Sequence, residues 1–273
     1  MDKKLFQRPS SRRIVRRPGS KGSFLQGIGY FIEYFLLILI ILAVWSAMAK
    51  AGRLNPVILP PPGKIVQTAW KLISSGSLLE NALISLMRVL QGYFLAALLG
   101  IGLGILIGLS RHLERITQLL FQIVKPIPPI AWIPLVILWF GIGESGKVFL
   151  IFLGGFFTIL TNVVDGIRHT DVKLKEVARV MEVPFYKTVI RLMIPSAAPS
   201  IFTGLRTGLA SCWMCVVAAE LVSSTTGLGY LIMNARQFGN TDVVIIGMIT
   251  IGIIGKLMDS LLKWIEGKVI RWL

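Results

Sequence analysis

Few ionisable residues interrupt the apolar stretches of this chain, and those few are candidates for chemistry at membrane depth. Arg206 and Glu220 lie fourteen residues apart in one apolar run, so a helix would bring them to nearly the same face, about 21 Å apart along its axis. Such charges either border a substrate pathway or pair with groups on other helices. An arginine in a pathway would suit an anionic substrate. We predict Arg206, Glu220 and the intervening Trp213 as pathway residues and keep structural pairing as the alternative.

Arg88 and Lys256 lie near the ends of apolar runs and are expected to reach the membrane surface.

Two cysteines are spaced as in thiol oxidoreductases. Cys212 and Cys215 have two residues between them, but they lie inside an apolar run without the strand and helix pattern that surrounds a thioredoxin-like site. We expect them to be small buried residues on one helix face, with a membrane thiol oxidoreductase as the alternative. His112 and His169 each stand alone near a membrane boundary, so no metal site is predicted.

The composition is that of an integral membrane protein. The chain has 273 residues, of which 54% are hydrophobic and 15% charged, and its mean hydropathy is +0.74. A soluble domain of this length would need more polar surface to cover its core. The net charge of +16 could indicate nucleic-acid binding, but 8 of the 29 basic residues precede the first apolar run and 6 cluster within 168–191. Such clustering is typical of the positive-inside rule, and no nucleic-acid partner is expected.

Six apolar runs each have close to the ~20 residues that a membrane-spanning helix requires. They cover residues 28–49, 87–109, 119–140, 147–167, 198–222 and 242–265. The sequence thus predicts an all-α membrane protein with about six transmembrane helices, in a domain over 28–265. A cleaved signal peptide ending near Ala47-Met-Ala49 is the alternative for the first run, but its apolar stretch is longer than the usual ~7–15 residues.

Basic residues decide which loops face the cytoplasm. If the N-terminus lies inside, the inside segments hold nineteen basic residues and the outside segments hold six. This bias predicts that both termini are cytoplasmic. Residues 1–27 then form a basic cytoplasmic tail, and residues 266–273 form a cytoplasmic C-terminal tail.

Glycines and prolines shape the predicted spans. Gly100, Gly104 and Gly108 are four residues apart, which allows a close helix contact within the bundle or, as the alternative, a seam between two copies. Prolines at 126, 128, 129 and 134 interrupt the third run, which predicts either a broken helix that lines a pathway or a simple kink. After three consecutive prolines at 60–62, apolar residues recur at helical spacing over 65–73. This pattern predicts a short amphipathic helix at the outer interface.

A charged segment lies between two of these apolar runs, so it must sit in water and is available to a soluble partner. Residues 174–181 have the apolar periodicity of a helix. Pro184 suits the first turn of a second helix, which we expect to run to about Ile194 and to end before Pro195. The sequence predicts two short amphipathic helices joined at Glu182-Val183, within a segment over 168–195.

This segment resembles the cytoplasmic coupling motif of ABC importer permeases, which reads Glu-Ala-Ala, three residues, Gly, nine residues, Ile, one residue, Leu-Pro. Glu176, Ala178 and Pro195 match the motif at the same spacing. Glu182 occupies the position of the motif's glycine, which serves a tight turn between the helices. We therefore expect an altered turn, while the docking function need not be lost.

Further motifs over residues 30–265 resemble the nitrate/sulfonate/taurine/bicarbonate branch of these permeases. They are Leu59-Pro-Pro-Pro62, Ser85-Leu-Met-Arg-Val-Leu90, Ile130-Ala-Trp-Ile-Pro-Leu135, Trp139-Phe-Gly-Ile-Gly-Glu144 and Gly227-Leu-Gly-Tyr-Leu-Ile232. The resemblance implies a type I ABC importer permease fold in the bacterial inner membrane. It also implies that the amphipathic helix is periplasmic and that the coupling helix pair is cytoplasmic.

The resemblance further implies the partners of this chain: a second permease copy, two cytoplasmic ATPase subunits and an external substrate-binding protein. The contact with the ATPase would be made by Glu176, Val177, Ala178, Val180, Met181 and Glu182. Glu176 would meet a basic group of the ATPase, and the apolar side chains would fill a groove beside it. The resemblance also implies that ATP and Mg²⁺ bind to the ATPase. The Gly143–Lys147 stretch of this chain is not a phosphate loop, because its glycine spacing is short and no Ser or Thr follows the lysine. We expect this chain to be a transport subunit without a cofactor or enzymatic activity.

The implied substrate is a small anion such as an aliphatic sulfonate or taurine, with nitrate, bicarbonate or another small nutrient as alternatives. An ion-coupled secondary transporter is the alternative outside this class. It is disfavoured because the sequence shows no clear repeat and the candidate carboxylates fall near the ends of spans. The choice of substrate is expected to reside largely in the separate binding protein.

Overall fold

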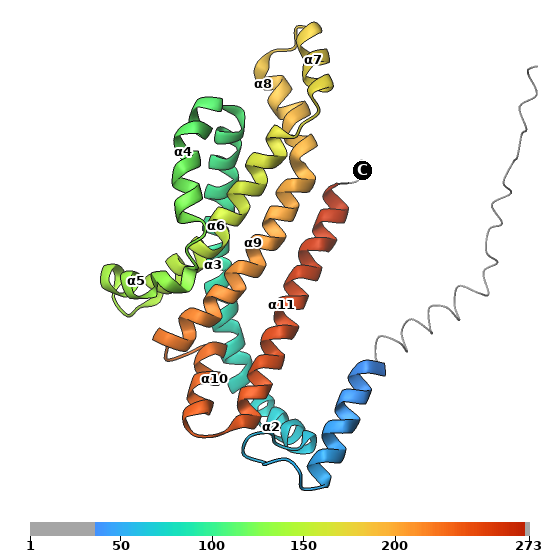
Figure 1. Cartoon of the computed structure of the whole chain (residues 1–273), viewed down its shortest axis with the longest axis vertical. Helices are drawn as coiled ribbons and strands as arrows, with labels where there is room; N and C mark the ends of the chain where they lie inside the picture. Colours follow the sequence, from blue (N-terminus) through green and yellow to red (C-terminus); the bar gives the residue numbers. More distant parts are fainter. Residues whose placement is uncertain (1–35, 271–273) are drawn as a thin grey trace, which may run out of the picture. The chain divides into compact units, whose positions relative to one another are not determined.

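The computed structural model describes residues 36–270, which form helices joined by turns and loops, with no strand in that range (Figure 1). By its internal contacts the chain divides between Leu54 and Asn55. The first unit contributes one described helix, Leu36–Lys50, and the second contributes all the others. The tail predicted over 1–27 lies outside the described residues, as do the first residues of the run predicted over 28–49.

Four helices of the second unit are long and apolar enough to cross a membrane. They are α3 (Ser77–Leu109), α6 (Glu144–Arg168), α11 (Thr241–Val269) and the continuous helix Phe185–Ser223, whose larger part is α9 (Ile194–Ser223). A bent pair of shorter helices, Arg111–Val124 and Pro129–Phe140, is a fifth candidate. These elements confirm the predicted all-α membrane architecture, and each apolar run from residue 87 onward coincides with one of them.

A close contact between α3 and α6 forms the core of the second unit. Every fourth residue of α3 from Gly92 to Gly108 is glycine or alanine, and each faces the α6 residue 59 positions later. The facing pairs are Gly92–Ile151, Ala96–Gly155, Gly100–Ile159, Gly104–Val163 and Gly108–Ile167. The constant offset means that the two helices run parallel, and the small residues let their backbones approach. The predicted packing role of the glycines within the bundle is therefore confirmed.

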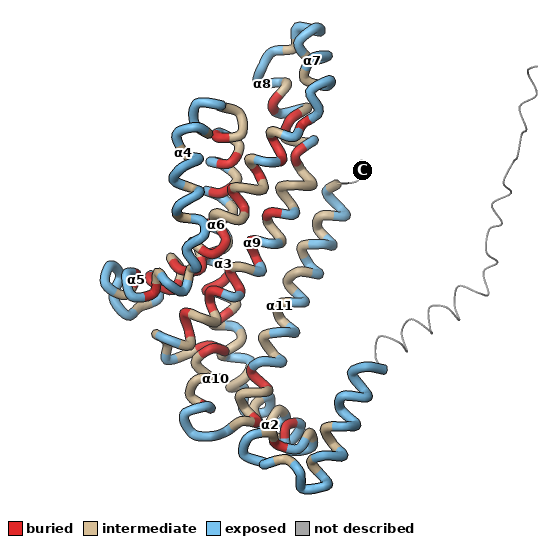
Figure 2. Tube along the Cα trace, viewed as in Figure 1, coloured by how far each residue is buried: buried red, intermediate tan, exposed pale blue. Residues whose placement is uncertain are grey.

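α9 packs antiparallel against the same helix, α6. Gly154 of α6 faces Cys215 of α9, whereas Gly166 faces Ser200, so positions on one helix rise as those on the other fall. Cys212 and Cys215 are both free and buried, as expected for small residues at a helix contact. Burial is concentrated where α3, α6 and α9 meet, while α11 is largely exposed or half-buried (Figure 2).

The third predicted run is broken, as its prolines indicated. α4 (Arg111–Val124) is followed by a 3₁₀ turn, η1 (Pro129–Trp132), and by α5 (Ile133–Phe140), and the two parts meet at 85°. Pro126, Pro128 and Pro129 have no N–H to continue the hydrogen-bond ladder of α4. The chain therefore turns sharply at residues 125–128.

Two short helices lie at the end of the unit where α9 leads into α11 (Figure 1). α10 (Leu228–Gln237) connects these two long helices, and α2 (Pro62–Ser74) is the predicted amphipathic helix. α2 buries Ile65, and its Thr68 hydroxyl donates to the Asp242 carboxylate of α11 at 2.7 Å. At its other end, α11 extends past the predicted boundary at 265, because its helical hydrogen bonding continues to Val269.

The predicted coupling helices are present as α7 (Val172–Val180) and α8 (Phe185–Thr188). The expectation that the second helix ends before Pro195 is wrong. This helix passes through a π-helical turn, η2 (Val189–Met193), and continues as α9. The Ile194 N–H bonds to the carbonyl five residues back, so the ladder is already widened where Pro195 lacks its donor.

We predict that Gly104→Ala destabilises the fold by about 1–3 kcal/mol. A Cβ at Gly104 would lie 2.7 Å from Val163 Cβ and 3.1 Å from the Leu160 carbonyl oxygen, which forces α3 and α6 apart. Gly102→Ala is the matched control, because a Cβ at Gly102 meets nothing within 4 Å and the change favours the helix by up to about 1 kcal/mol. Thermal unfolding in detergent measures both variants, and equal melting temperatures would contradict the packing role.

Candidate functional site

The coupling segment ends α7 in a left-handed turn at Glu182. Its φ is +52°, and it is the only non-glycine residue with a positive φ among residues 36–270. The Glu182 N–H bonds to the Arg179 carbonyl at 3.0 Å, and the Val183 N–H bonds to the Ala178 carbonyl at 3.0 Å. These two bonds form a Schellman motif, whose left-handed residue is usually glycine. Contrary to the expected alteration, the glutamate adopts the conformation that a glycine would serve, and the turn is retained.

The tip of the segment presents apolar side chains at its surface. The residues predicted for the ATPase contact lie together here: Glu176, Val177, Ala178, Val180, Met181 and Glu182. None of the nine residues of α7 is buried, and Val180 and Met181 are 83% and 71% exposed. Ala178 is half-buried, and the two glutamates are exposed. An exposed apolar group bordered by charges is typical of a protein contact, and the assignment of the ATPase as the partner stays a prediction.

The base of the segment is packed into the bundle. Val189 and Met193 are buried against Ile167 of α6 and Ala197 of α9. The Asp171 carboxylate caps the start of α7 by accepting a hydrogen bond from a backbone N–H of its first turn. The packing of the base against α6 and α9 therefore fixes the position from which the exposed tip projects.

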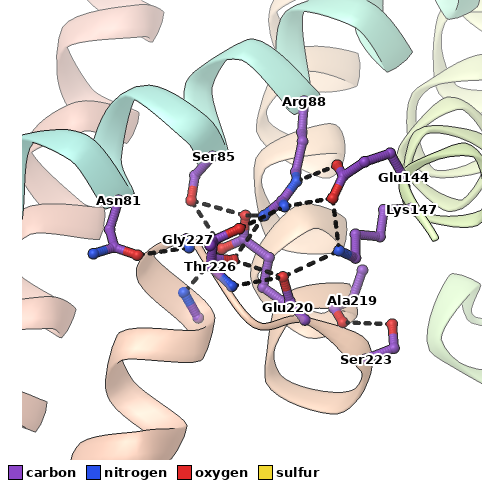
Figure 3. A network of polar contacts seen from close by, with 12 residues as sticks. Asn81, Ser85, Arg88, Glu144, Lys147, Ala219, Glu220, Ser223, Thr226 and Gly227 are labelled. Atoms are coloured by element: carbon purple, nitrogen blue, oxygen red, sulfur yellow. Dashed lines mark hydrogen bonds and ion pairs between the residues drawn. The ribbon is translucent and has the colours of Figure 1, made fainter. Parts of the chain in front are cut away.

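A cluster of polar side chains lies where α3, α6 and α9 approach α10 (Figure 3). Arg88 of α3 is 4% exposed. Its Nε and Nη2 donate to the two carboxylate oxygens of Glu144 at 2.6 and 2.7 Å, and its Nη1 donates to Glu220 at 2.7 Å. The Lys147 ammonium donates to Glu144 at 2.9 Å. The positive charges of Arg88 and Lys147 thus equal the negative charges of Glu144 and Glu220. Of these four side chains only Glu144 reaches the surface.

The same cluster holds the turn between α9 and α10. Glu220, 1% exposed, accepts hydrogen bonds from the Ser85 hydroxyl at 2.8 Å and from the Gly229 N–H at 2.9 Å. Gly227 has a φ of +108°, and a Cβ there would overlap the Glu220 carboxylate. Both the backbone conformation and the space therefore require glycine at this position.

Three of the sequence motifs meet in this cluster. One supplies Ser85 and Arg88, another ends with Glu144, and the third contains both Gly227 and Gly229. The expectation that Arg88 reaches the membrane surface is wrong, because its guanidinium is buried and paired. Its carboxylate partners lie 56 and 132 residues away, so no local spacing indicated them.

The three predicted pathway residues all contact neighbouring helices. Arg206 donates to Asp259 of α11 at 3.0 and 3.1 Å and pairs with a second α11 carboxylate. Trp213 donates its Nε1–H to the Ile251 carbonyl at 3.1 Å. Arg206 and Glu220 are not brought together, because the first pairs with α11 and the second with α3 and α10. These contacts fit structural pairing, and a role in the pathway stays a prediction.

We expect Glu220→Ala to lower the stability of the fold by about 3–5 kcal/mol, because the buried cations Arg88 and Lys147 would then share the single carboxylate of Glu144. Glu144→Ala is the control: its side chain is 61% exposed, so Arg88 gains access to water and the loss is smaller. Thermal unfolding in detergent and the yield of monodisperse protein measure the difference. A Glu220→Ala variant that melts like the wild type but transports poorly would support a pathway role instead.

Glu182→Gly should stabilise the coupling turn, because a left-handed conformation costs a residue with a Cβ roughly 1–2 kcal/mol. Slower hydrogen exchange of the α7 amides is the expected result. Arg179→Gly is the control, since it places glycine within α7 and should cost about 1 kcal/mol. Faster exchange in Glu182→Gly than in the wild type would show that the glutamate side chain itself holds the turn.

Known proteins resemble this chain along most of its length. The model of the family described as binding-protein-dependent transport system inner membrane component matches residues 100–271. A putative aliphatic sulfonates transport permease protein of Bacillus subtilis is 38% identical over 260 residues, which are 95% of this chain and 92% of that protein. The taurine transport system permease protein of Escherichia coli is 32% identical over 85% of this chain and 86% of its own. The bicarbonate transport system permease protein of Synechococcus elongatus is 32% identical over 95% and 98%.

The fold also has a counterpart among solved structures. A chain of the inward-facing MetNI methionine ABC transporter superposes with a TM-score of 0.62 at 19% sequence identity, over 72% of this chain and 96% of that chain. This similarity concerns the arrangement of the helices. The chain belongs to the family of binding-protein-dependent transport system inner membrane components, and it is an ABC transporter permease rather than an enzyme.

Proposed function

We propose that this permease forms the membrane pathway of an ATP-driven importer for a small anion, such as an aliphatic sulfonate or taurine. The coupling segment carries the proposal, because it offers an exposed apolar tip on a packed base, with the spacing and the left-handed turn of the family motif. The relatives support the substrate class, since a sulfonate and a taurine permease resemble 95% and 85% of this chain.

In this proposal ATP acts on the chain only through the coupling segment. Two cytoplasmic ATPase subunits bind ATP and Mg²⁺, and Glu176 pairs with a basic group at their surface. Val180 and Met181 fill the adjoining groove. Because Phe185–Ser223 is one continuous helix of 39 residues, a displacement at Phe185 is carried along its axis into the middle of the bundle. The permease thereby switches which side of the membrane its pathway opens to.

A second permease copy and an external binding protein complete the proposed assembly. The coupling segment and the C-terminal end of α11 lie toward one end of the second unit, with α2 and α10 toward the other (Figure 1). We place the first end in the cytoplasm and the second at the periplasmic face of a bacterial inner membrane. The binding protein would deliver the anion at the periplasmic face.

Bicarbonate is the second candidate substrate. It is favoured by one observation, namely the 32% identity to a bicarbonate permease over 95% of this chain. Nitrate, implied by the branch that the motifs resemble, belongs to the same class of small oxyanions. In this proposal the binding protein makes most of the selection among them.

We predict that Glu176→Lys abolishes coupling while leaving membrane insertion intact. In proteoliposomes with the ATPase and binding protein, the wild type should take up radiolabelled taurine or an alkanesulfonate when ATP is supplied. The variant should lose at least about tenfold in uptake and in substrate-stimulated ATP hydrolysis, because like charges then meet at the contact. Glu80→Lys is the control, since this exposed carboxylate lies in the first turn of α3.

Three results would count against these assignments. Normal uptake and stimulated hydrolysis in Glu176→Lys would remove the residue from the ATPase contact. Wild-type uptake that follows an ion gradient and ignores ATP would refute ATP-driven import. Import of bicarbonate without import of any sulfonate would replace the proposed substrate.

A further inference from the structure

The sharp turn after α4 borders a cavity of about 290 Å³ between the bent pair, α6 and α9. Its walls combine aromatic and aliphatic side chains, such as Trp132, Phe157 and Met214, with a few polar ones. Those polar groups include the hydroxyls of Thr158 and Ser211. A small concave site with a mostly apolar wall and a few polar groups is the usual form of a small-molecule site.

This cavity lies near the middle of a membrane-spanning helix. Thr158 is ten residues from Arg168, the last residue of α6, and fourteen from Glu144, the first. At 1.5 Å per residue, it lies about 15 Å from one end of the helix and about 21 Å from the other. Polar groups at this depth are expensive where lipid tails surround them. Hydroxyls and an ammonium in a mostly apolar wall here therefore indicate passage or binding of a solute with a polar end.

Lys125, at the start of the turn, supplies the only charge among the described residues in the wall of this cavity. Its Nζ lies 3.4 Å from the hydroxyl oxygen of Thr161, which is three residues beyond Thr158 on α6 and lines a neighbouring cavity. It takes part in none of the ion pairs within residues 36–270. Arg88 and Arg206 differ, because each of them pairs with two carboxylates. The Lys125 ammonium is therefore left to pair with an anion, which its N–H donors suit.

A second cavity of about 290 Å³ continues from Lys125 toward the Arg168 end of α6. Lys125 lines both cavities, whereas Glu114 and Asp165 line only the second. The first cavity thus has one cation in its wall, and the second has two carboxylates beside the same cation. An anion would be held on the Thr158 side of the lysine and opposed on the other side.

We propose that the first cavity is an anion-binding site of the import pathway, with Lys125 as its charge-recognising residue. The ligand class is a small oxyanion with a short apolar part, held at its charged end by the Lys125 ammonium and the hydroxyls of Thr158 and Ser211. Trp132 and Phe157 contact its apolar part. This site rests on the proposed import of an anion. It adds a group within the permease that selects for charge, which is the role predicted for Arg206.

The test compares Lys125→Gln and Lys125→Arg in proteoliposomes that contain the complete transporter and its binding protein. Uptake of radiolabelled taurine at a subsaturating concentration should fall at least about tenfold in Lys125→Gln, because a charged hydrogen bond is lost. ATP hydrolysis stimulated by the loaded binding protein should stay within about twofold of the wild type, since the ATPase contact is untouched. Lys125→Arg should keep most of the uptake. Lys256→Gln is the control, because this cation has a 77% exposed side chain and lines neither cavity.

Two outcomes would overturn the site alone: wild-type uptake kinetics in Lys125→Gln, or equal losses in Lys125→Gln and Lys125→Arg, which would indicate a role in shape rather than charge. Melting temperatures measured in parallel identify a folding defect, which would lower uptake and ATP hydrolysis together. Import of a neutral solute but of no anion by the wild type would overturn the proposed function and the site with it.

Discussion

The buried guanidinium of Arg88 is the interaction on which the arrangement of the helix ends depends. It binds carboxylates from α6 and α9 at once, and the second of these also holds the first turn of α10. A charge in these surroundings is tolerated only while its partners stay in place. These hydrogen bonds therefore fix both the spacing and the relative orientation of the helices near α10. The opposite end, near the coupling segment, combines apolar contacts of Ile167 and Ala197, which are non-directional, with an ion pair between Arg168 and Glu114.

The continuity of α8, η2 and α9 allows a displacement of the coupling segment to be transmitted into the bundle. A separate docking helix on a flexible linker would absorb a displacement, whereas a single helix transmits it along its axis. Pro195 and Pro199 both lie in this helix, and the π turn admits the first of them without a break. The helix therefore stays continuous from its exposed start at Phe185 through its buried base.

Hydropathy and proline spacing predicted the spans from residue 87 onward, the broken third helix and the amphipathic helix before α3, because each depends on residues near one another in sequence. The close packing at Gly104 was also predictable, although its partner helix was not. Arg88 was misjudged, since its surroundings are built by residues 56 and 132 positions away. The passage of a helix through Pro195 was missed because a π turn leaves no compositional mark. Glu182 shows the reverse case: the motif located the left-handed turn, and the residue type alone would have argued against it.

The fixed offset between α3 and α6 restricts how these two helices can move during transport. Small residues of α3 recur every four positions against branched or small residues of α6, so the contact repeats only after about 6 Å of sliding. Any smaller slide would push a branched side chain into a backbone. The pair is therefore expected to tilt as one rigid unit, and α9, which also packs on α6 through small residues, is expected to move with it. Rearrangement during transport would then fall on the contacts of this unit with α4 and α11.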